Sequence, residues 1–184
     1  TLNGISASSN YSGDGAYLEA GSGITIKNSM FNNNQNGFND VLGNGVWVTP
    51  ANKGNILIEN SNVRYNQEDN LQLNTLSGTV TLKNVNATGT TYGYGVFIDN
   101  CALAASCTAP AKAVTITDLV AEYADSEAMI VRSNGAITVT NLTANYSGKG
   151  TGGVLLFNHQ ATGAPAGSIT NASMKNSGGT GLEI

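Results

Sequence analysis

Residues 79–87 read TVTLKNVNA, a strand of alternating apolar residues that ends in an asparagine, Asn84. The same pattern occurs five more times, as GITIKNSMF (23–31), NILIENSNV (55–63), AVTITDLVA (113–121), AITVTNLTA (136–144) and GSITNASM (167–174). One column of the pattern holds Asn28, Asn60, Asn84, Asp118, Asn141 and Asn171, at spacings of 32, 24, 34, 23 and 30 residues. A period of this length is typical of a solenoid, in which each repeat buries its apolar face against its neighbours.

Two further columns keep the same period. A short strand in each repeat is led by a small or polar residue: Gly15, Gly45, Asn70, Gly95, Ala128, Gly153 and Gly181. A weaker column follows the asparagines and contains Phe31, Val63, Ala87, Ala121, Ala144 and Met174. Three strands per repeat in a fixed order, without a helical period, predict an all-β, single-stranded parallel solenoid of about six to seven coils.

The strand before each asparagine predicts which side chains form the core. Because side chains alternate along a strand, the paired apolar residues should point inward: Ile24/Ile26, Ile56/Ile58, Val80/Leu82, Val114/Ile116 and Ile137/Val139. We expect the asparagine column to turn the corner as a buried ladder, with the amides hydrogen-bonded at a coil spacing of ~4.8 Å. Asp118 interrupts the amides, and its ionised carboxylate can only accept hydrogen bonds.

These columns resemble the right-handed parallel β-helix of the pectate-lyase-like superfamily, in which the corner between the second and third sheets often carries an asparagine ladder. The resemblance covers essentially the whole chain. It implies that the glycine-led strands form the first sheet, the strands before the asparagines the second, and the column from Phe31 to Met174 the third. It implies little about function, because one fold hosts many activities.

Composition limits the partners. The 184 residues suffice for a single domain, 1–184, and carry only 11% charged residues with a net charge of −4. No basic patch favours nucleic acid, and no apolar run approaches the ~18 residues of a membrane span. The chain lacks an initiating Met and stops within a repeat, so we expect a fragment whose partners include flanking domains of the same chain. We expect an extracellular or cell-surface location, in a bacterial protein.

Two cysteines, Cys101 and Cys107, lie six residues apart in the insert DNCALAASCTAPAKA. This spacing, in an alanine-rich loop without histidine, favours a local disulfide over a metal site. The alternative is two free thiols. A disulfide would agree with an extracellular location, because such bonds persist in oxidising environments.

The outward positions of the first sheet predict a ligand surface. One outward column reads Tyr17, Trp47, Gln72, Phe97, Ile130, Leu155 and Glu183, and its neighbour reads Glu19, Thr49, Asn74, Asp99, Arg132 and Phe157. Aromatic rings beside hydrogen-bonding groups are typical of saccharide sites. We therefore predict that polysaccharide or a cell-surface glycan binds around Tyr17, Trp47, Phe97, Asp99 and Arg132. Two alternatives are that a protein partner binds this stripe, or that the inserts 49–55, 99–113 and 157–167 fold back and bury these rings.

Catalytic and metal signals are weak. Enzymes of the resembled family use three grouped aspartates, or an arginine beside calcium-binding acids, and neither set is evident here. Arg132 lies one coil from Asp99, a pairing more typical of a surface ion pair. Calcium has oxygen ligands at Asp14, Glu68-Asp69 and Asp125-Ser-Glu127, but no calcium-binding motif is present. The sequence therefore predicts no catalytic residue and no cofactor, with calcium left open.

The interpretation that best fits these patterns is a non-catalytic extracellular β-helical module. Such a module would act as a rigid spacer, an adhesin or a polysaccharide-binding surface. The alternative is a polysaccharide lyase, hydrolase or epimerase of the pectate-lyase-like superfamily, with active coils partly outside this chain.

Overall fold

The computed structural model describes residues 1–35, 43–100, 112–149, 152–158 and 167–184. These residues form fourteen β-strands and no helix. Accordingly, the described part of the chain contains no helix of the length and apolarity needed to cross a membrane. The strands make two sheets of seven strands each. The all-β class predicted from the sequence is confirmed.

The strands alternate between the two sheets along the chain. The first sheet contains β2 (Ala16–Leu18), β4 (Val46–Val48), β6 (Leu71–Asn74), β8 (Val96–Asp99), β10 (Met129–Ser133), β12 (Val154–Asn158) and β14 (Leu182–Glu183). The second sheet contains β1 (Leu2–Asn3), β3 (Ile24–Lys27), β5 (Ile56–Asn62), β7 (Val80–Asn86), β9 (Val114–Val120), β11 (Ile137–Thr143) and β13 (Gly167–Ser173).

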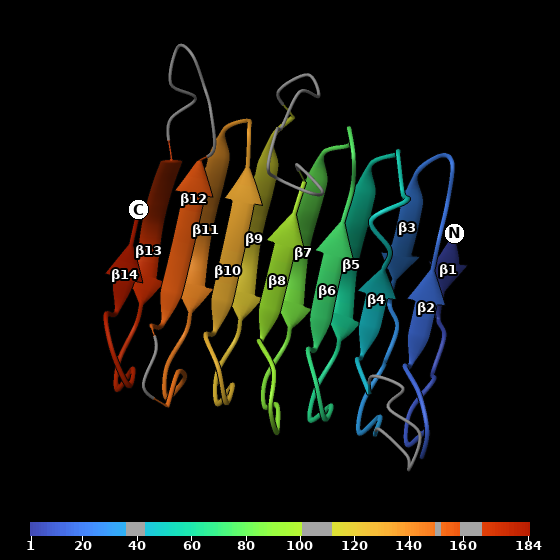
Figure 1. The fold of residues 1–184 in the computed structure, drawn as a ribbon, viewed down its shortest axis with the longest axis horizontal. Coiled ribbons are helices and arrows are strands. Elements are labelled where there is room, and N and C mark those ends of the chain that lie inside the picture. Colours follow the sequence, from blue (N-terminus) through green and yellow to red (C-terminus); the bar gives the residue numbers. More distant parts are fainter. Residues whose placement is uncertain (36–42, 101–111, 150–151, 159–166) are drawn as a thin grey trace.

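Every strand pairs in parallel with the strand two places away in the sequence, so that β5, for example, lies between β3 and β7. The two sheets face each other, and successive coils stack side by side from the N-terminus to the C-terminus (Figure 1). This arrangement is consistent with a parallel β-solenoid. The parallel stacking explains why the sequence columns repeat, since equivalent residues of neighbouring coils lie in register.

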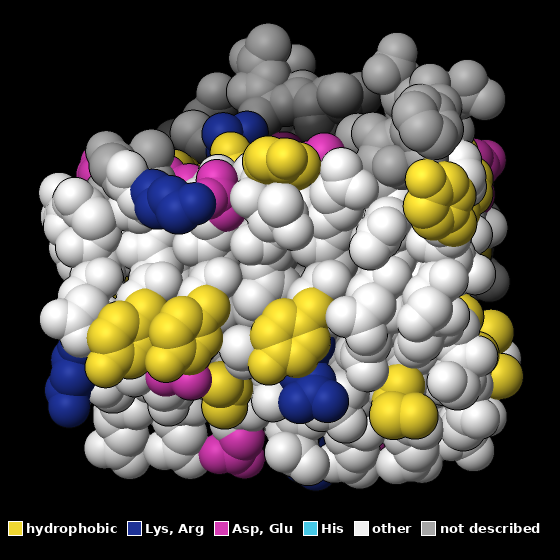
Figure 2. Space-filling view, turned by 90° about the horizontal axis from the view of Figure 1, so that it is seen from below, with side chains coloured by type: hydrophobic (Ala, Val, Ile, Leu, Met, Phe, Trp, Pro, Cys, Tyr) yellow, Lys and Arg dark blue, Asp and Glu magenta, His cyan; other side chains and the backbone are white. Residues whose placement is uncertain are grey.

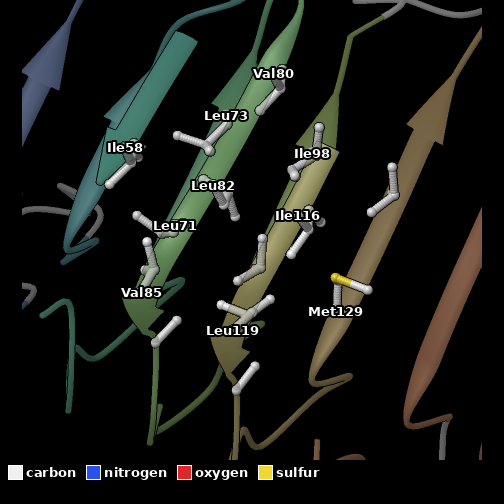
Figure 3. Packing of buried hydrophobic residues seen from close by; sticks show 14 of the residues in the cluster. Ile58, Leu71, Leu73, Val80, Leu82, Val85, Ile98, Ile116, Leu119 and Met129 are labelled. Carbon is white, nitrogen blue, oxygen red and sulfur yellow. The ribbon is translucent and has the colours of Figure 1, made fainter. Parts of the chain in front are cut away.

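The core lies between the two sheets. All ten residues of the predicted inward pairs, from Ile24/Ile26 to Ile137/Val139, are buried. In Figure 3, Ile58, Leu82 and Ile116 of the second sheet and Leu71, Leu73 and Ile98 of the first sheet fill the space between the strands. The small residue that leads each first-sheet strand has a steric reason. At Gly45, for example, a Cβ would lie 2.1 Å from Cγ1 of Val63.

The predicted third sheet is not present as a separate sheet. Phe31, Val63 and Ala87 are fully buried, as a core column requires, but they belong to no strand of the described residues. Instead, β5 runs through the corner and keeps pairing beyond it, with Ser61 opposite Val85 of β7. The register skips the corner residue, Asn60 opposite Asn84, and continues unchanged beyond it. The described coils therefore contain two strands each rather than three.

The asparagine column is exposed, and the prediction of a buried ladder at these positions is wrong. The six corner residues have φ between 50° and 57°, in the left-handed region: Asn28, Asn60, Asn84, Asp118, Asn141 and Asn171. Asn and Asp enter this region more readily than other residues with a side chain. The corner therefore selects asparagine for its backbone conformation, and the side chains point to solvent.

Neighbouring corner side chains still form hydrogen-bonded pairs. The Asn84 amide donates to Oδ1 of Asn60 at 2.9 Å, and the Asn141 amide donates to Oδ1 of Asp118 at 2.7 Å. Asn171 donates in turn to Oδ1 of Asn141 at 3.2 Å. Asp118 acts only as an acceptor, as predicted, because its carboxylate has no hydrogen to donate.

A buried amide ladder lies at a different corner, three residues beyond the third column. The Asn34 amide donates to Oδ1 of Asn66 at 2.9 Å, and the Asn66 amide donates to Oδ1 of Asn70 at 2.7 Å and to the Phe31 carbonyl at 3.0 Å. The exposed Asn10 extends the ladder by donating to Oδ1 of Asn34 at 2.8 Å. Asn34, Asn66 and Asn70 are fully buried, so these amides satisfy polar groups that water does not reach.

Cys101 and Cys107 lie outside the described residues, so their disulfide stays a prediction. The insert 49–55 is described in full, whereas the inserts 99–113 and 157–167 are described only at their ends.

Candidate functional site

The outward column of the first sheet has the predicted register. Tyr17 pairs with Trp47, Trp47 with Gln72, and Gln72 with Phe97. The column continues through Ile130, Leu155 and Glu183. Each of these side chains is therefore one coil from the next, at the ~4.8 Å spacing of paired strands.

The aromatic residues of this face form two groups on either side of Gln72. The Tyr17 and Trp47 rings meet edge to face, with centroids 5.0 Å apart. The Tyr94 and Phe97 rings stack at 5.6 Å, and the Arg132 guanidinium lies 5.3 Å from the centre of the Phe97 ring. The structure thus brings Phe97 and Arg132 together, as predicted, and adds Tyr94, which the sequence columns did not single out.

The predicted stripe is less exposed than the alternation pattern suggests. Tyr17 is 58% exposed, but Trp47 and Phe97 are each partly buried, and Ile130 is 4% exposed. Nε1 of Trp47 is buried and has no hydrogen-bond partner within the described part of the chain. The aromatic column is therefore only partly accessible to a ligand: it is neither a fully exposed surface nor buried in the core.

Three of the six residues of the second outward column are buried, which corrects its prediction as a continuous polar surface. Asp99 is 7% exposed, and Thr49 and Asn74 are buried as well. These residues lie where the first-sheet strands end and the chain turns. The side chain of Asn74 folds along the stack there, and its amide donates to the Val48 carbonyl at 2.8 Å. Asp99 lies opposite Arg132 in the register of β8 and β10, but its burial leaves Arg132 as the more accessible of the two.

A pocket of about 260 Å³ opens at the start of the first sheet. We call it the Asp69 pocket, and its lining comprises Asn44, Glu68, Asp69, Gln72, Tyr92, Gly93, Tyr94 and Ser126. Gln72 connects it to the outward column of the first sheet. The sequence drew attention to Glu68 and Asp69 only as calcium ligands. The sequence did contain a signal for this pocket. The residue before each strand-leading residue, here Asn44, Asp69 and Tyr94, lines the pocket.

A column of acids and amides supports this pocket. Asp14 accepts hydrogen bonds from the Asn44 backbone N–H at 2.8 Å and from the Asn44 amide at 3.0 Å. Asn44 in turn accepts the Asp69 N–H at 3.1 Å, and Asp69 accepts the Tyr94 N–H at 2.8 Å. Each side chain thus holds the backbone of the next coil. The column fixes the Asp69 carboxyl at the pocket without a basic partner in an ion pair among the described residues.

Burial controls the protonation of these acids. It raises the pKa of Asp69 to about 7, an effect that the Tyr94 N–H opposes and the Glu68 charge increases. Burial also raises the pKa of Asp14, against the hydrogen bonds from Asn44. The Tyr94 pKa is raised by burial and by the Glu127 and Asp69 charges, against the Arg132 charge. Near neutral pH, the Asp69 carboxyl therefore both donates and accepts hydrogen bonds.

Three of the five acids suggested as calcium ligands have other partners. Asp14 and Asp69 bind backbone N–H groups of the next coil, and Asp125 forms an ion pair with Lys149. Across the described ranges, three His, Cys, Asp or Glu side chains nowhere come together as a metal site.

The burial of Asp69 predicts a pH-dependent stability. We expect the free energy of unfolding to fall by on the order of 2–4 kcal/mol as pH rises from about 4 to about 7, and to level off above. In this range the folded protein keeps the Asp69 proton, whereas the unfolded chain, with a carboxyl pKa of about 3.9, has lost it. Urea unfolding between pH 4 and 8 measures this slope.

The Asp69→Asn variant should remove most of the slope. Asn44 already accepts the equivalent N–H one coil earlier, so an asparagine at position 69 can keep this bond. The exposed Asp118→Asn is the control and should retain the wild-type slope. Equal slopes in wild type and Asp69→Asn would show that this carboxyl titrates normally.

The chain matches no family model. It also matches no curated protein and no solved structure.

Proposed function

We propose that this chain is a non-catalytic, polysaccharide-binding module of a larger extracellular bacterial protein. In this proposal it is a right-handed single-stranded parallel β-helix of the pectate-lyase-like kind, with six to seven coils. Two facing parallel sheets and a left-handed asparagine corner in each coil support the architecture. The stacked coils would also make it a rigid spacer, because hydrogen bonds in both sheets join each coil to the next.

The observation that carries the binding proposal is the Asp69 pocket beside the aromatic column. A saccharide ring needs apolar surface for its C–H groups and both donors and acceptors for its hydroxyls. The Gln72 amide and the Asp69 carboxyl, near its pKa of about 7, offer both kinds of hydrogen bond. Tyr94 and Phe97 on one side, and Trp47 on the other, offer ring surface. Strand spacing places these groups along the solenoid axis, the direction that an extended polysaccharide would follow.

The test is a glycan array followed by titration of the best hit. We expect Gln72→Ala to weaken binding at least tenfold with little change in melting temperature, because Gln72 is partly exposed and lines the pocket. Thr138→Ala is the control, since Thr138 is exposed on β11 of the opposite sheet. An array without a hit, or equal affinity in both variants, would contradict the proposal.

One observation favours an enzyme as the second candidate. A carboxyl with a pKa near 7 is suited to act as a general acid or base, and Asp69 lines a pocket. A lyase, hydrolase or epimerase would convert the array hit into shortened, unsaturated or epimerised products. Mass spectrometry and NMR of the incubated hit distinguish these outcomes. Turnover by the wild type that Asp69→Asn abolishes would favour the enzyme, and an unchanged glycan would favour the binding module.

A further inference from the structure

The second corner of the coils carries a tyrosine in three of its seven described positions, Tyr65, Tyr123 and Tyr146. At this corner the chain passes from the second sheet to the first, along the lower edge in Figure 1. The residue at this corner again has a positive φ, between 56° and 74°. The residues are Ser9, Asn33, Tyr65, Gly89, Tyr123, Tyr146 and Asn176. Viewed from below, this face shows several hydrophobic side chains in a row (Figure 2).

Tyrosine is an unfavourable choice for this conformation. Asparagine and glycine fill it elsewhere in the same column, whereas a bulky side chain at positive φ is an outlier. Burial does not compensate, because Tyr65, Tyr123 and Tyr146 each expose more than half of their side chain. Stacking accounts for one pair, since the Tyr123 and Tyr146 rings lie parallel with centroids 5.0 Å apart. Backbone strain of this kind gathers at functional sites, which directs attention to Tyr65.

Tyr65 stands beside a glycine and a pocket. In place of a tyrosine, the next coil has Gly89, and a Cβ there would lie 2.6 Å from Cδ1 of the Tyr65 ring. The missing side chain thus makes room for this ring. Tyr65 also lines a pocket of about 260 Å³, together with Gln35, Gln67, Thr91 and Tyr92. We call it the tyrosine pocket.

The chemistry of the tyrosine pocket selects a neutral, hydroxyl-rich ring. Its lining has two phenols, two amides and one hydroxyl, and no charged side chain. Tyr65 and Tyr92 expose 57% and 62% of their side chains, so apolar ring surface stands next to hydrogen-bonding groups. The volume is at the small end for ligand sites, which fits a single ring rather than a long segment. The Arg64 guanidinium lies 5.8 Å from the centre of the Tyr65 ring, but Arg64 is not part of the lining, so a charged ligand would find no counter-charge within the pocket itself.

We propose that the tyrosine pocket binds one ring of a neutral saccharide, at a site distinct from the first-sheet face. Tyr92 lines both this pocket and the Asp69 pocket, so the two adjoin. This site does not depend on the first-sheet proposal, because Gln35, Tyr65, Gln67 and Thr91 take no part in the Asp69 pocket.

The decisive variant is Tyr65→Asn, with Tyr146→Asn as its matched control. Both tyrosines are at the same corner, with φ of 58° and 57° and similar exposure, but only Tyr65 lines the pocket. Asn33 fills this corner one coil before Tyr65, at φ 57°. Asparagine therefore suits the backbone, and loss of binding in Tyr65→Asn would not reflect unfolding.

The experiment titrates ¹⁵N-labelled protein with neutral hexasaccharides of glucose, mannose and galactose, and with hexagalacturonate as a charged comparison. We expect at least one neutral hexasaccharide to shift the side-chain amide signals of Gln35 and Gln67. Tyr65→Asn should weaken this binding at least tenfold, and Tyr146→Asn by less than twofold. Gln72→Ala separates the two sites, because it should leave these shifts in place.

Three results would overturn the proposal. The first is that no neutral hexasaccharide binds, or only hexagalacturonate does. The second is that Tyr65→Asn and Tyr146→Asn have equal effects. Binding would then depend on all the corner tyrosines and not on the tyrosine pocket. The third is that Gln72→Ala abolishes binding and Tyr65→Asn does not, which would leave the first-sheet proposal standing alone.

Discussion

The Asn66→Ala variant is expected to lower the free energy of unfolding by about 3–5 kcal/mol. Asn66 is fully buried and makes four hydrogen bonds within 3.0 Å through its side chain. Its Oδ1 accepts the backbone N–H and the amide of Asn34, and its amide donates to the Phe31 carbonyl and to Oδ1 of Asn70. Truncation leaves these partners buried and unpaired, and each such group costs about 1–3 kcal/mol unless water or a shift of the chain compensates.

Equilibrium urea unfolding measures this loss, with Asn60→Gly as its control. Asn60 is exposed at a corner with φ of 50°, a conformation that glycine adopts freely. Its side chain accepts one hydrogen bond from Asn84, at the surface. We therefore expect Asn60→Gly to change stability by less than about 1 kcal/mol. A larger loss in Asn60→Gly than in Asn66→Ala would mean that the exposed ladder stabilises the fold more than the buried one.

The second large effect is expected for Phe31→Ala, at about 3–5 kcal/mol. Phe31 is the largest fully buried side chain among the described residues, at the third column of its coil. Its equivalents in the next two coils are Val63 and Ala87, which are smaller. Removal of the ring would open a cavity that the stacked coils cannot close, because backbone hydrogen bonds such as Phe31 N–H to the Asn62 carbonyl fix the coil spacing.

Denaturant and thermal unfolding measure this effect too, and Tyr11→Ala is the comparison. Tyr11 is 67% exposed, so its truncation should change stability by no more than about 0.5 kcal/mol. Similar losses for the two aromatic truncations would show that the N-terminal coils are already loose in the wild type. In that case the Phe31 ring would contribute no more than a surface side chain.

The sequence predicted the candidate site only in part. The register of the outward column was correct from Tyr17 to Glu183, because alternation along a strand is local. Exposure along that column and its neighbour was not predictable in the same way. Asp99 is buried where the chain turns at the strand ends, and this depends on the path of the connections. The Asp69 pocket lies at the opposite ends of these strands, where turns of neighbouring coils meet.

The sequence by itself determined the repeat, the parallel strands, the inward pairs and the position of the asparagine corner. These features depend on periodicity and on the backbone preferences of single residues, which are local. Only the tertiary structure decided which asparagines are buried. Asn60 and Asn66 lie six residues apart in the same coil, yet the first is exposed and the second fully buried. The direction of a side chain after a left-handed corner depends on where the chain turns next and on the coils stacked against it, and no local pattern encodes either.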